Sequence, residues 1–563
     1  MILLRSLAFL TVFCGVGSVA FLSWPQHLQA QSVSAATMQE VLAAPAVTVG
    51  ALVLDRAALN AVYTQTNYAL LWGDARRRQV ALSTLEAADA HGLVPSDYHV
   101  SEITAEQNPQ QLDLLLTDAL MRYASDVRVG RVSPRQVKGE RFSPSQKIDP
   151  VAVVLEAAKA SDLKGYLEGL PPQSPVYRGL QMALAKLRSW EAQGEWPKIS
   201  EGSKLEPGKS SPRVVQLRKR LAATGELAEA VNDDSPLYDD KLAQAVRLYQ
   251  DRSGLEPDGV VGRATVAALN VPLSRRIAQV KANMERLRWQ PAQLGSRYVF
   301  VNIPAYQLVA VADGKVQLNM KVIVGRPKRP SPVFADLIRM VEFNPDWHVP
   351  PTIAREDVLP HLIEDPNYAL EHKNVRIYQA GVEVDPHTVD WTTANIRDYR
   401  LRAEPGPRNP LGTVKFLFPN RFDVYLHDTN ERELFRKDVR AISSGCIRVA
   451  DPAALTNWLL TADRKDWSEA KRTKILDSRK QTRLILNTPV PVYLSYITAW
   501  MGAGAQPVFR DDIYNQDGAL IAALAAVEAK SRRAVATMVR AGDGSAPVNE
   551  ASVPAEELQK AAP

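Results

Sequence analysis

The spacing of hydrophobic residues in this chain changes near residue 297, so the two parts of the chain are expected to form different secondary structure. Before that point, apolar residues recur at helical spacing in the stretches 54–63, 82–88 and 112–127. After it, they alternate with mostly polar neighbours, most clearly from Val316 to Val324, which is typical of strands that bury one face. The sequence therefore predicts an α+β multidomain chain, in which an all-α part precedes a β-rich domain.

The length of 563 residues agrees with this division, because one domain takes roughly 150 residues. We expect a helical scaffold domain, a three-helix module and a β-rich domain over residues 50–200, 210–272 and 296–515. Residues 202–211, rich in Pro, Gly, Ser and Lys, are predicted to form a linker. A charged, helix-prone insertion interrupts the β-rich domain at 352–400, and the Ala-, Glu- and Pro-rich residues 542–563 predict a disordered tail.

The first 30 residues have the composition of an export signal. Arg5 is their only charge, the run from Leu7 to Leu22 is apolar, and Leu28-Gln29-Ala30 places a small residue where cleavage could occur. The same run, residues 7–23, could instead remain as a membrane anchor, since its length lies between that of a signal and that of a full span. The sequence predicts export and leaves cleavage or anchorage open.

Cysteine usage directs attention to Cys446. The only other cysteine, Cys14, lies in the export segment, so cleavage would leave a single thiol. An exported chain with one cysteine cannot close an internal disulfide, which leaves an intermolecular bond or a reactive free thiol. A lone cysteine is also often inert core filling, so its neighbours decide between these interpretations.

Those neighbours favour chemistry. Cys446 stands in Ser443-Ser444-Gly445-Cys446-Ile447-Arg448-Val449, and Tyr425-Leu426-His427 places a histidine 19 residues upstream. Gly445 leaves the backbone free to turn and present amide groups to a carbonyl. His427 could take the thiol proton, and Arg448 could stabilise negative charge or hold a carboxylate. We therefore predict an ionised Cys446 beside the His427 imidazole.

The two segments together resemble the active-site signature of the YkuD-type L,D-transpeptidases, in particular the large multi-domain YcbB-like type. The resemblance implies that Cys446 is the nucleophile, His427 the base, Arg448 a motif arginine and Tyr425 a wall of the donor pocket. Backbone amides near Gly445 and Cys446 would form the oxyanion hole. Ser444 stands where many members have histidine, and Asp451 where many have asparagine.

The same resemblance extends over the rest of the chain. Trp72, Tyr98 and Gly130-Arg131-Val132 are similar to the amino-terminal scaffold of these enzymes, and we interpret the two aromatic residues as core. Residues 245–250 and 258–265 are similar to the peptidoglycan-binding type 1 pattern, in which Asp258-Gly259 is expected to make a turn. The insertion at 352–400 occupies the place of a capping segment, which is either a lid over the cleft or a decoration.

The resemblance implies a periplasmic enzyme that forms 3→3 cross-links in peptidoglycan. A donor tetrapeptide stem would acylate Cys446 with loss of D-alanine, and the side-chain amine of diaminopimelate would accept the acyl group, without a cofactor. Carbapenem-type β-lactams acylate this cysteine in family members and are expected inhibitors. Two alternatives stay open: an L,D-carboxypeptidase that uses water as acceptor, and a non-catalytic wall-binding scaffold.

Composition argues against other functions. The formal charge is +6, with basic and acidic residues interspersed, and no nucleic-acid-binding pattern is present. His348, His361, His372 and His387 share one region, but none has the spacing of a two-histidine helix motif and no cysteine lies among them. We therefore expect neither a nucleic-acid partner nor a metal site.

Overall fold

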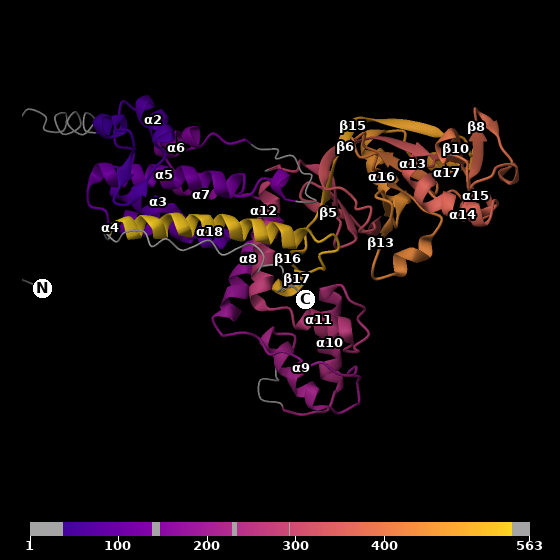
Figure 1. Cartoon of the computed structure of the whole chain (residues 1–563), viewed down its shortest axis with the longest axis horizontal. Coiled ribbons are helices and arrows are strands. Elements are labelled where there is room, and N and C mark those ends of the chain that lie inside the picture. Colours follow the sequence, from indigo (N-terminus) through magenta and orange to yellow (C-terminus); the bar gives the residue numbers. More distant parts are fainter. Residues whose placement is uncertain (1–37, 138–146, 228–233, 292, 543–563) are drawn as a thin grey trace, which may run out of the picture.

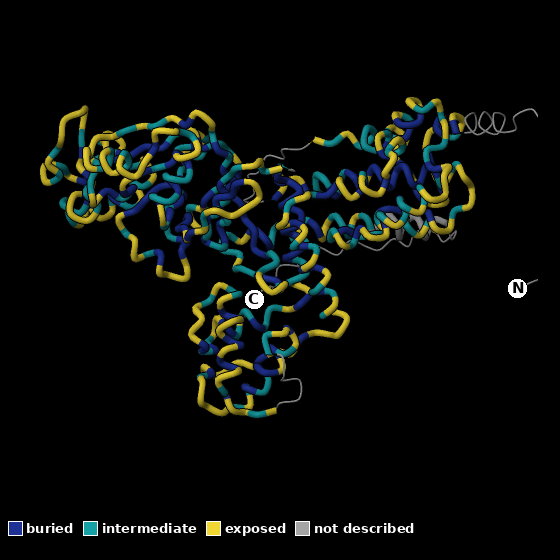
Figure 2. Tube along the Cα trace, turned by 180° about the vertical axis from the view of Figure 1, so that it is seen from behind, coloured by how far each residue is buried: buried dark blue, intermediate teal, exposed yellow. Residues whose placement is uncertain are grey.

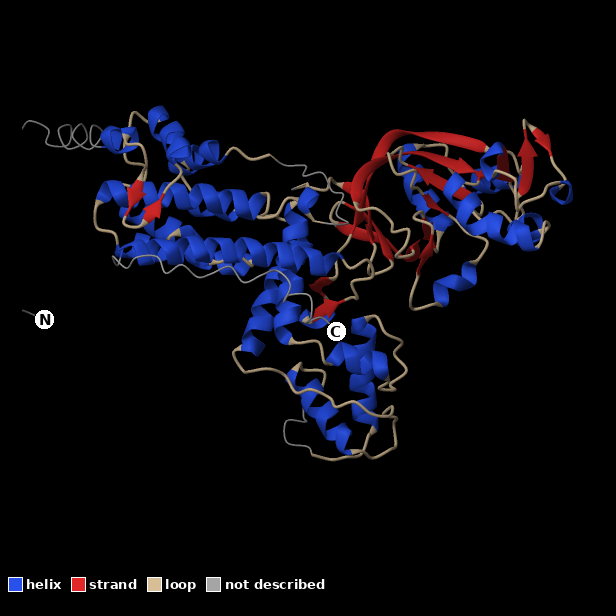
Figure 3. Cartoon of the chain, in the orientation of Figure 1, coloured by secondary structure: helices blue, strands red, loops and turns tan. Residues whose placement is uncertain are grey.

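The computed structural model describes residues 38–137, 147–227, 234–291 and 293–542. They form three lobes, a helical arm, a β-rich domain and a small helical module, which meet at a central hub (Figure 1). Helices make up the arm and the module, and strands are concentrated in the β-rich domain (Figure 3). The predicted α+β multidomain architecture is confirmed. The predicted export segment and nearly all of the predicted tail lie outside the described residues.

The arm is an all-α bundle with one short hairpin. Its core includes Trp72 and Tyr98, which are 1% and 0% exposed, so their interpretation as core is confirmed. The Asp113 carboxylate, also buried, accepts hydrogen bonds from the Tyr63 hydroxyl (2.5 Å) and the Trp72 amide (2.7 Å), and thereby ties the loop before α3 to α5. The elements of the arm are β1 (Thr48–Val49), β2 (Leu52–Val53), α2 (Arg56–Gln65), α3 (Ala75–Glu86), α4 (Val100–Ala105), α5 (Pro109–Arg128), α6 (Pro150–Lys159) and α7 (Leu163–Glu168).

The module is a three-helix unit formed by α9 (Pro212–Ala223), α10 (Asp240–Ser253) and α11 (Arg263–Leu269). Gln250 of α10, 2% exposed, accepts from the Gly259 amide (2.9 Å) and donates to Asp258 (2.9 Å). The predicted Asp-Gly turn is therefore stabilised by hydrogen bonds to a buried side chain. Part of the predicted linker at 202–211 packs against the module. Leu205 belongs to the core of the module and forms a bridge with Val261, because its apolar side chain completes the small hydrophobic core.

The hub joins the lobes through α8 (Pro175–Glu191), α12 (Leu273–Arg288) and the hairpin of β16 (Ala499–Met501) and β17 (Pro507–Phe509). From the hub, α18 (Gln516–Gly542) runs back along the arm (Figure 1), where Ser531 donates to Asp97 (2.7 Å). A buried ion pair between Arg286 and Asp517 (2.5 Å, both 3% exposed) joins α12 to α18. Buried residues continue through the hub into each lobe (Figure 2).

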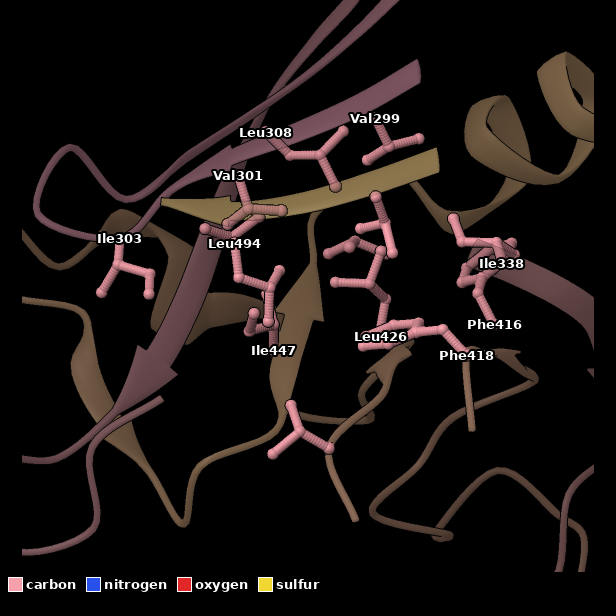
Figure 4. Packing of buried hydrophobic residues seen from close by; sticks show 14 of the residues in the cluster. Val299, Val301, Ile303, Leu308, Ile338, Phe416, Phe418, Leu426, Ile447 and Leu494 are labelled. Carbon is pink, nitrogen blue, oxygen red and sulfur yellow. The ribbon is translucent and has the colours of Figure 1, made fainter. Parts of the chain in front are cut away.

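The β-rich domain is a closed barrel. Its strands follow the order β13-β5-β14-β12-β11-β6-β15-β3-β4, and β4 pairs again with β5 to close the ring. Apolar side chains such as Val301, Leu426 and Ile447 fill the interior (Figure 4). The elements are β3 (Arg297–Asn302), β4 (Gln307–Ala312), β5 (Lys315–Gly325), β6 (Phe334–Phe343), β11 (Val414–Leu417), β12 (Leu426–His427), β13 (Ala441–Ser443), β14 (Ile447–Val449), β15 (Thr482–Ser495), α16 (Pro452–Asp463) and α17 (Glu469–Asp477).

The inserted segment is an independent α/β unit, which we call the cap (residues 347–403). It has its own core, around Leu362, Trp391 and Leu401, and a four-stranded sheet in the order β7-β10-β8-β9. The sequence predicted helices here but no sheet, and the sheet includes residues on both sides of the predicted range. The elements are β7 (Trp347–His348), α13 (Pro351–Ile353), a π-helical turn (Ala354–Val358), α14 (Leu359–Glu364), α15 (Tyr368–Lys373), β8 (Arg376–Gln379), β9 (Val382–Glu383) and β10 (Tyr399–Ala403).

Across the described part of the chain, no helix combines the length and apolar character needed to cross a membrane.

Candidate active site

Two neighbouring strands bring the sequence-predicted residues together. β12 and β14 pair in parallel, with Leu426 opposite Ile447 and His427 opposite Arg448. Leu426 and Ile447 point into the barrel core. Because side chains alternate along a strand, His427 and Arg448 face outward. Cys446 immediately precedes β14 and continues this alternation, which places it on the same outer face.

A tight turn, the nucleophile loop (residues 443–446), presents Cys446. The Ser443 hydroxyl accepts from the Gly445 amide (3.2 Å) and donates to the Cys446 carbonyl (2.6 Å). Gly445 has φ +117°, a conformation that side-chain-bearing residues rarely adopt. An added Cβ would meet no atom nearer than 3.9 Å, so the backbone angle, not space, requires glycine.

The turn leaves one amide free for an oxyanion. The Gly445 amide is already bonded to Ser443, which argues against the expectation that it serves the oxyanion. The Cys446 amide has no acceptor among the described residues. A carbonyl carbon attacked by the thiol would place its oxygen near this amide, the usual position of an oxyanion donor.

His427 is held as a neutral base. Its side chain is 5% exposed, and its Nδ1 lies 2.5 Å from the Asp428 carbonyl oxygen. A carbonyl only accepts hydrogen bonds, so Nδ1 carries the proton and Nε2 keeps its lone pair. Burial, followed by the charge of Arg448, lowers the pKa of His427 to about 3. The imidazole is therefore uncharged at neutral pH.

Cys446 rests as a thiol, not as the predicted thiolate. The residue is partly exposed, but burial of the sulfur raises its pKa to about 11, and hydrogen bonds from the Tyr425 backbone and hydroxyl only partly oppose this shift. Burial therefore opposes the predicted ionisation of the sulfur in the resting protein, and the neutral imidazole gives a thiolate no cationic partner. The arrangement favours proton transfer during attack by a general base.

Tyr425 forms one wall of the site. Its ring lies edge-on to His427, with centroids 5.6 Å apart, and 5.5 Å from Lys415 Nζ. Burial and the neighbouring Cys446 raise its pKa well above the ordinary value, so the hydroxyl remains a donor toward sulfur. Lys415 pairs with the fully buried Glu342 (2.8 Å), which fixes the lysine beneath the ring.

The other two predicted residues have protein partners. Arg448 pairs with Glu431 (2.6 Å) and lies 3.4 Å from the Thr429 hydroxyl. The Ser444 hydroxyl accepts from Arg329 Nη1 (3.1 Å). The structure thus places Arg448 beside His427, and Ser444 against a loop outside the motif.

Sequence reasoning missed the residues that hold the nucleophile loop from behind. We call residues 325–331 the support loop. Its Ser331 hydroxyl donates to the Gly445 carbonyl (2.7 Å) and accepts from the Gly325 amide (2.9 Å), and its Arg329 reaches Ser444. Ser443 was visible in the motif but had no predicted role. The only signal for the support loop was a Pro- and Arg-rich stretch after a strand.

One group of potential metal ligands lies on the cap, where Asp365, Glu371 and His372 come within 4.8 Å of one another. All three side chains are exposed. Exposed acidic groups often cluster without an ion, so we assign this group no function.

A thiol, a neutral imidazole and an amide lie on one face of the barrel, an arrangement typical of sites for acyl transfer. Residues 296–492 match the L,D-transpeptidase catalytic domain (YkuD). Residues 57–184 match a scaffold domain, and residues 210–269 match the domain described as "Putative peptidoglycan binding domain". The chain therefore contains a YkuD-type L,D-transpeptidase catalytic domain, preceded by the scaffold and peptidoglycan-binding-like domains.

Two known proteins are similar to parts of the chain. A Haemophilus influenzae protein named "Putative L,D-transpeptidase" is 38% identical over 236 residues, which cover 42% of this chain and 47% of that protein. The amidase CwlM of Mycobacterium tuberculosis is 38% identical over 80 residues, 13% of this chain and 20% of CwlM. The chain thus spans about half, or less, of the length of these relatives.

Two solved L,D-transpeptidase structures also match. The one from Xylanimonas cellulosilytica is 16% identical and covers 53% of this chain and 99% of its own, with a TM-score of 0.17. The one from Stackebrandtia nassauensis is 13% identical and covers 53% and 96%, with a TM-score of 0.20. At these TM-scores the two structures carry no argument about the site.

Proposed function

We propose that this protein is a peptidoglycan L,D-transpeptidase that forms 3→3 cross-links through a thioester on Cys446. The observation that carries the proposal is the placement of Cys446 and the neutral His427 on adjacent parallel strands, within a domain that matches L,D-transpeptidases. The module that matches a peptidoglycan-binding domain supports the cell wall as the substrate. An exported, periplasmic location follows from this substrate and from the amino-terminal segment.

Acylation would begin with proton transfer from the Cys446 thiol to Nε2 of His427. The sulfur attacks the carbonyl between the third and fourth residues of a donor tetrapeptide stem, and the oxyanion is held by the Cys446 amide. The C–N bond then breaks, and D-alanine leaves with the proton that the imidazolium returns. The Nδ1 bond to the Asp428 carbonyl keeps the ring orientation through both transfers.

Deacylation reverses these roles. The side-chain amine of diaminopimelate on a neighbouring stem attacks the thioester, His427 accepts a proton from the amine, and the sulfur leaves and is reprotonated. The new amide is the 3→3 cross-link. The acyl-enzyme conserves the energy of the cleaved amide, so the exchange needs no nucleotide and no cofactor.

The nucleophile is tested most directly with a carbapenem. We expect intact-mass spectrometry to detect one adduct on the wild-type protein and none on Cys446→Ser, because only the thiol can open the β-lactam ring at this site. An adduct that persists on Cys446→Ser would contradict the assignment.

The acceptor is tested with muropeptides. Purified protein and tetrapeptide-bearing muropeptides should yield 3→3 dimers with free D-alanine, and Cys446→Ala should yield neither. Release of D-alanine without dimers would identify an L,D-carboxypeptidase instead. Absence of both products, with wall binding retained, would indicate a non-catalytic scaffold.

A further inference from the structure

The side chain of Arg329, in the support loop, contacts both the cap and the nucleophile loop. Its Nη1 donates to Asp357 of the cap (2.5 Å) and to the Ser444 hydroxyl (3.1 Å), and its Nη2 donates to Glu356 (2.5 Å). Ser444 is two residues before the nucleophile Cys446 and lies inside the same tight turn. One guanidinium therefore bridges the inserted unit and the turn that presents the thiol.

The bridge is better buried at Arg329 than a typical surface ion pair. The Arg329 side chain is 14% exposed. Burial by itself would lower the pKa of Arg329, but hydrogen bonds and charge interactions with Glu356 and Asp357 raise this pKa above the ordinary value. Asp357 also accepts two bonds from Arg326 (2.8 and 2.9 Å), so one cap carboxylate joins both arginines of the support loop. Planar, multiply bonded guanidinium–carboxylate contacts fix orientation as well as distance.

Both ends of the bridge are held by further hydrogen bonds or local structure. The Arg326 amide donates to the Ser443 carbonyl (2.9 Å), and the Ser331 hydroxyl donates to the Gly445 carbonyl, so the support loop is bonded to the nucleophile loop at two points besides Arg329. At the other end, Glu356 and Asp357 lie in the π-helical turn Ala354–Val358. Such turns are rare and concentrate at functional sites, and here the turn directs two consecutive carboxylates at Arg329.

We propose that Arg329 is a positioning residue, which transmits docking of the cap, through Asp357, to the nucleophile loop and so sets the attack geometry of Cys446. This inference rests on the proposed function of Cys446 and adds a role for the cap in the chemical step. Its physical basis is that small displacements of a reacting group cost large factors in rate. When the cap releases Asp357, Arg329 loses the partners that hold it against Ser444.

The test compares Asp357→Asn with Glu383→Gln in the full chain. The control removes an exposed ion pair with Arg376 (2.7 Å) that belongs to the cap alone. Acylation of Cys446 by a carbapenem is followed by mass spectrometry over a range of inhibitor concentrations. We expect Asp357→Asn to lower the limiting acylation rate about tenfold, with a half-saturating concentration within about twofold of wild type, and Glu383→Gln to resemble wild type.

Other outcomes would overturn the proposal. A wild-type or higher limiting rate in Asp357→Asn would mean that the cap carboxylate does not support the loop or that it obstructs the site. A higher half-saturating concentration at an unchanged limiting rate would instead make Arg329 a ligand-binding residue. The double variant Asp357→Asn/Ser444→Ala should lower the limiting acylation rate by less than the product of the two single reductions, because both substitutions break the same connection.

A second measurement separates failure of this proposal from failure of the proposed function. Hydrogen exchange of the peptide that contains residues 443–446 does not require activity. We expect this peptide to exchange faster in Asp357→Asn and in Arg329→Gln than in wild type, while the thermal stability of both variants stays unchanged. In Glu383→Gln we expect the wild-type exchange rate. If the wild-type protein forms no carbapenem adduct, the proposed function of Cys446 fails. Slower exchange in wild type than in Asp357→Asn would still support the connection between the cap and the nucleophile loop. Equal exchange in the two proteins would overturn that connection.

Discussion

At the scale of single residues, the proton shared by the catalytic pair lies on the sulfur of Cys446 in the resting site. Burial raises the pKa of Cys446 and lowers that of His427, so the uncharged pair is the stable form at neutral pH. A neutral thiol is protected from oxidation and from stray electrophiles, because the thiolate is the reactive species. The cost is that the base must remove the proton at the moment of attack.

This resting state predicts the pH dependence of alkylation at Cys446. With a thiol pKa of about 11, the thiolate fraction rises about tenfold per pH unit between pH 7 and 10. His427, with a pKa of about 3, does not change charge in that range. The rate of iodoacetamide labelling, resolved from Cys14 by peptide mapping, should rise throughout this range without levelling.

The denatured chain is the control for this experiment. Its labelling should level off above the ordinary cysteine pKa of about 8.5, since burial no longer acts on the sulfur. A plateau at or below pH 7 in the folded protein would instead indicate a preformed thiolate–imidazolium pair.

At the scale of elements, the sequence predicts strands and helices that bury one face, and it misses those that do not. The alternation from Val316 to Val324 anticipates β5, and the helical spacing in 54–63 anticipates α2. In α12, Leu273, Val280, Met284 and Leu287 recur at helical spacing. Buried charges such as Glu285 and Arg288, which pair with each other (2.7 Å), interrupt the polar face that would have made this helix easy to recognise in the sequence.

The site was predictable in its residues but not in its supports. The motif identifies Cys446 and His427 as candidates, whereas their adjacency depends on the parallel register of β12, which is only two residues long. Ser331 and Arg329 reach the nucleophile loop from 114 and 115 residues away in sequence. Contacts of this kind are set by tertiary packing and leave no trace in local spacing.

The segment that enters α18 is a further support of the site. The Tyr514 hydroxyl donates to the Gly325 carbonyl (2.5 Å) and accepts from the Ser331 amide (3.2 Å). It therefore holds both ends of the support loop. Tyr514 lies beyond the residues that match the catalytic domain, so the carboxy-terminal segment contributes to the site from outside that domain.

Tyr514→Phe should loosen the support loop. We expect a loss of about 1–2 kcal/mol in the free energy of unfolding, since two buried polar groups lose a partner, and slower carbapenem acylation of Cys446. Tyr493→Phe is the matched control, because its hydroxyl donates to the Leu294 carbonyl (3.1 Å) and not to the support loop. Equal acylation rates in the two variants would contradict a role for the Tyr514 hydroxyl in the site.

At the scale of the whole molecule, the lobes are joined by specific polar contacts at the hub. Arg252 of the module donates to the Pro507 carbonyl in β17 (2.8 Å), and Arg510 donates to the Arg252 carbonyl (2.6 Å). Lys186 of α8 donates to the Ala505 carbonyl in the same hairpin (3.0 Å). The β16–β17 hairpin and the residues next to it thus connect the module to α8 of the hub.

Arg252→Ala tests whether these contacts hold the module in place. Burial and the charges of Arg220 and Arg276 lower the pKa of Arg252 to about 10, so it is still charged at neutral pH and pairs with Glu226, whose side chain is 5% exposed. Removing the guanidinium leaves that carboxylate buried without its cation. We expect a loss of about 3 kcal/mol in the free energy of unfolding, at the low end for a buried pair because repulsion among the arginines is relieved.

The measurements for Arg252→Ala are calorimetry, in which we expect an earlier unfolding transition, and X-ray scattering, in which we expect a broader distance distribution. Arg247→Ala, at an exposed position of the same helix, should change neither, and an unaltered Arg252→Ala would mean that apolar packing alone positions the module.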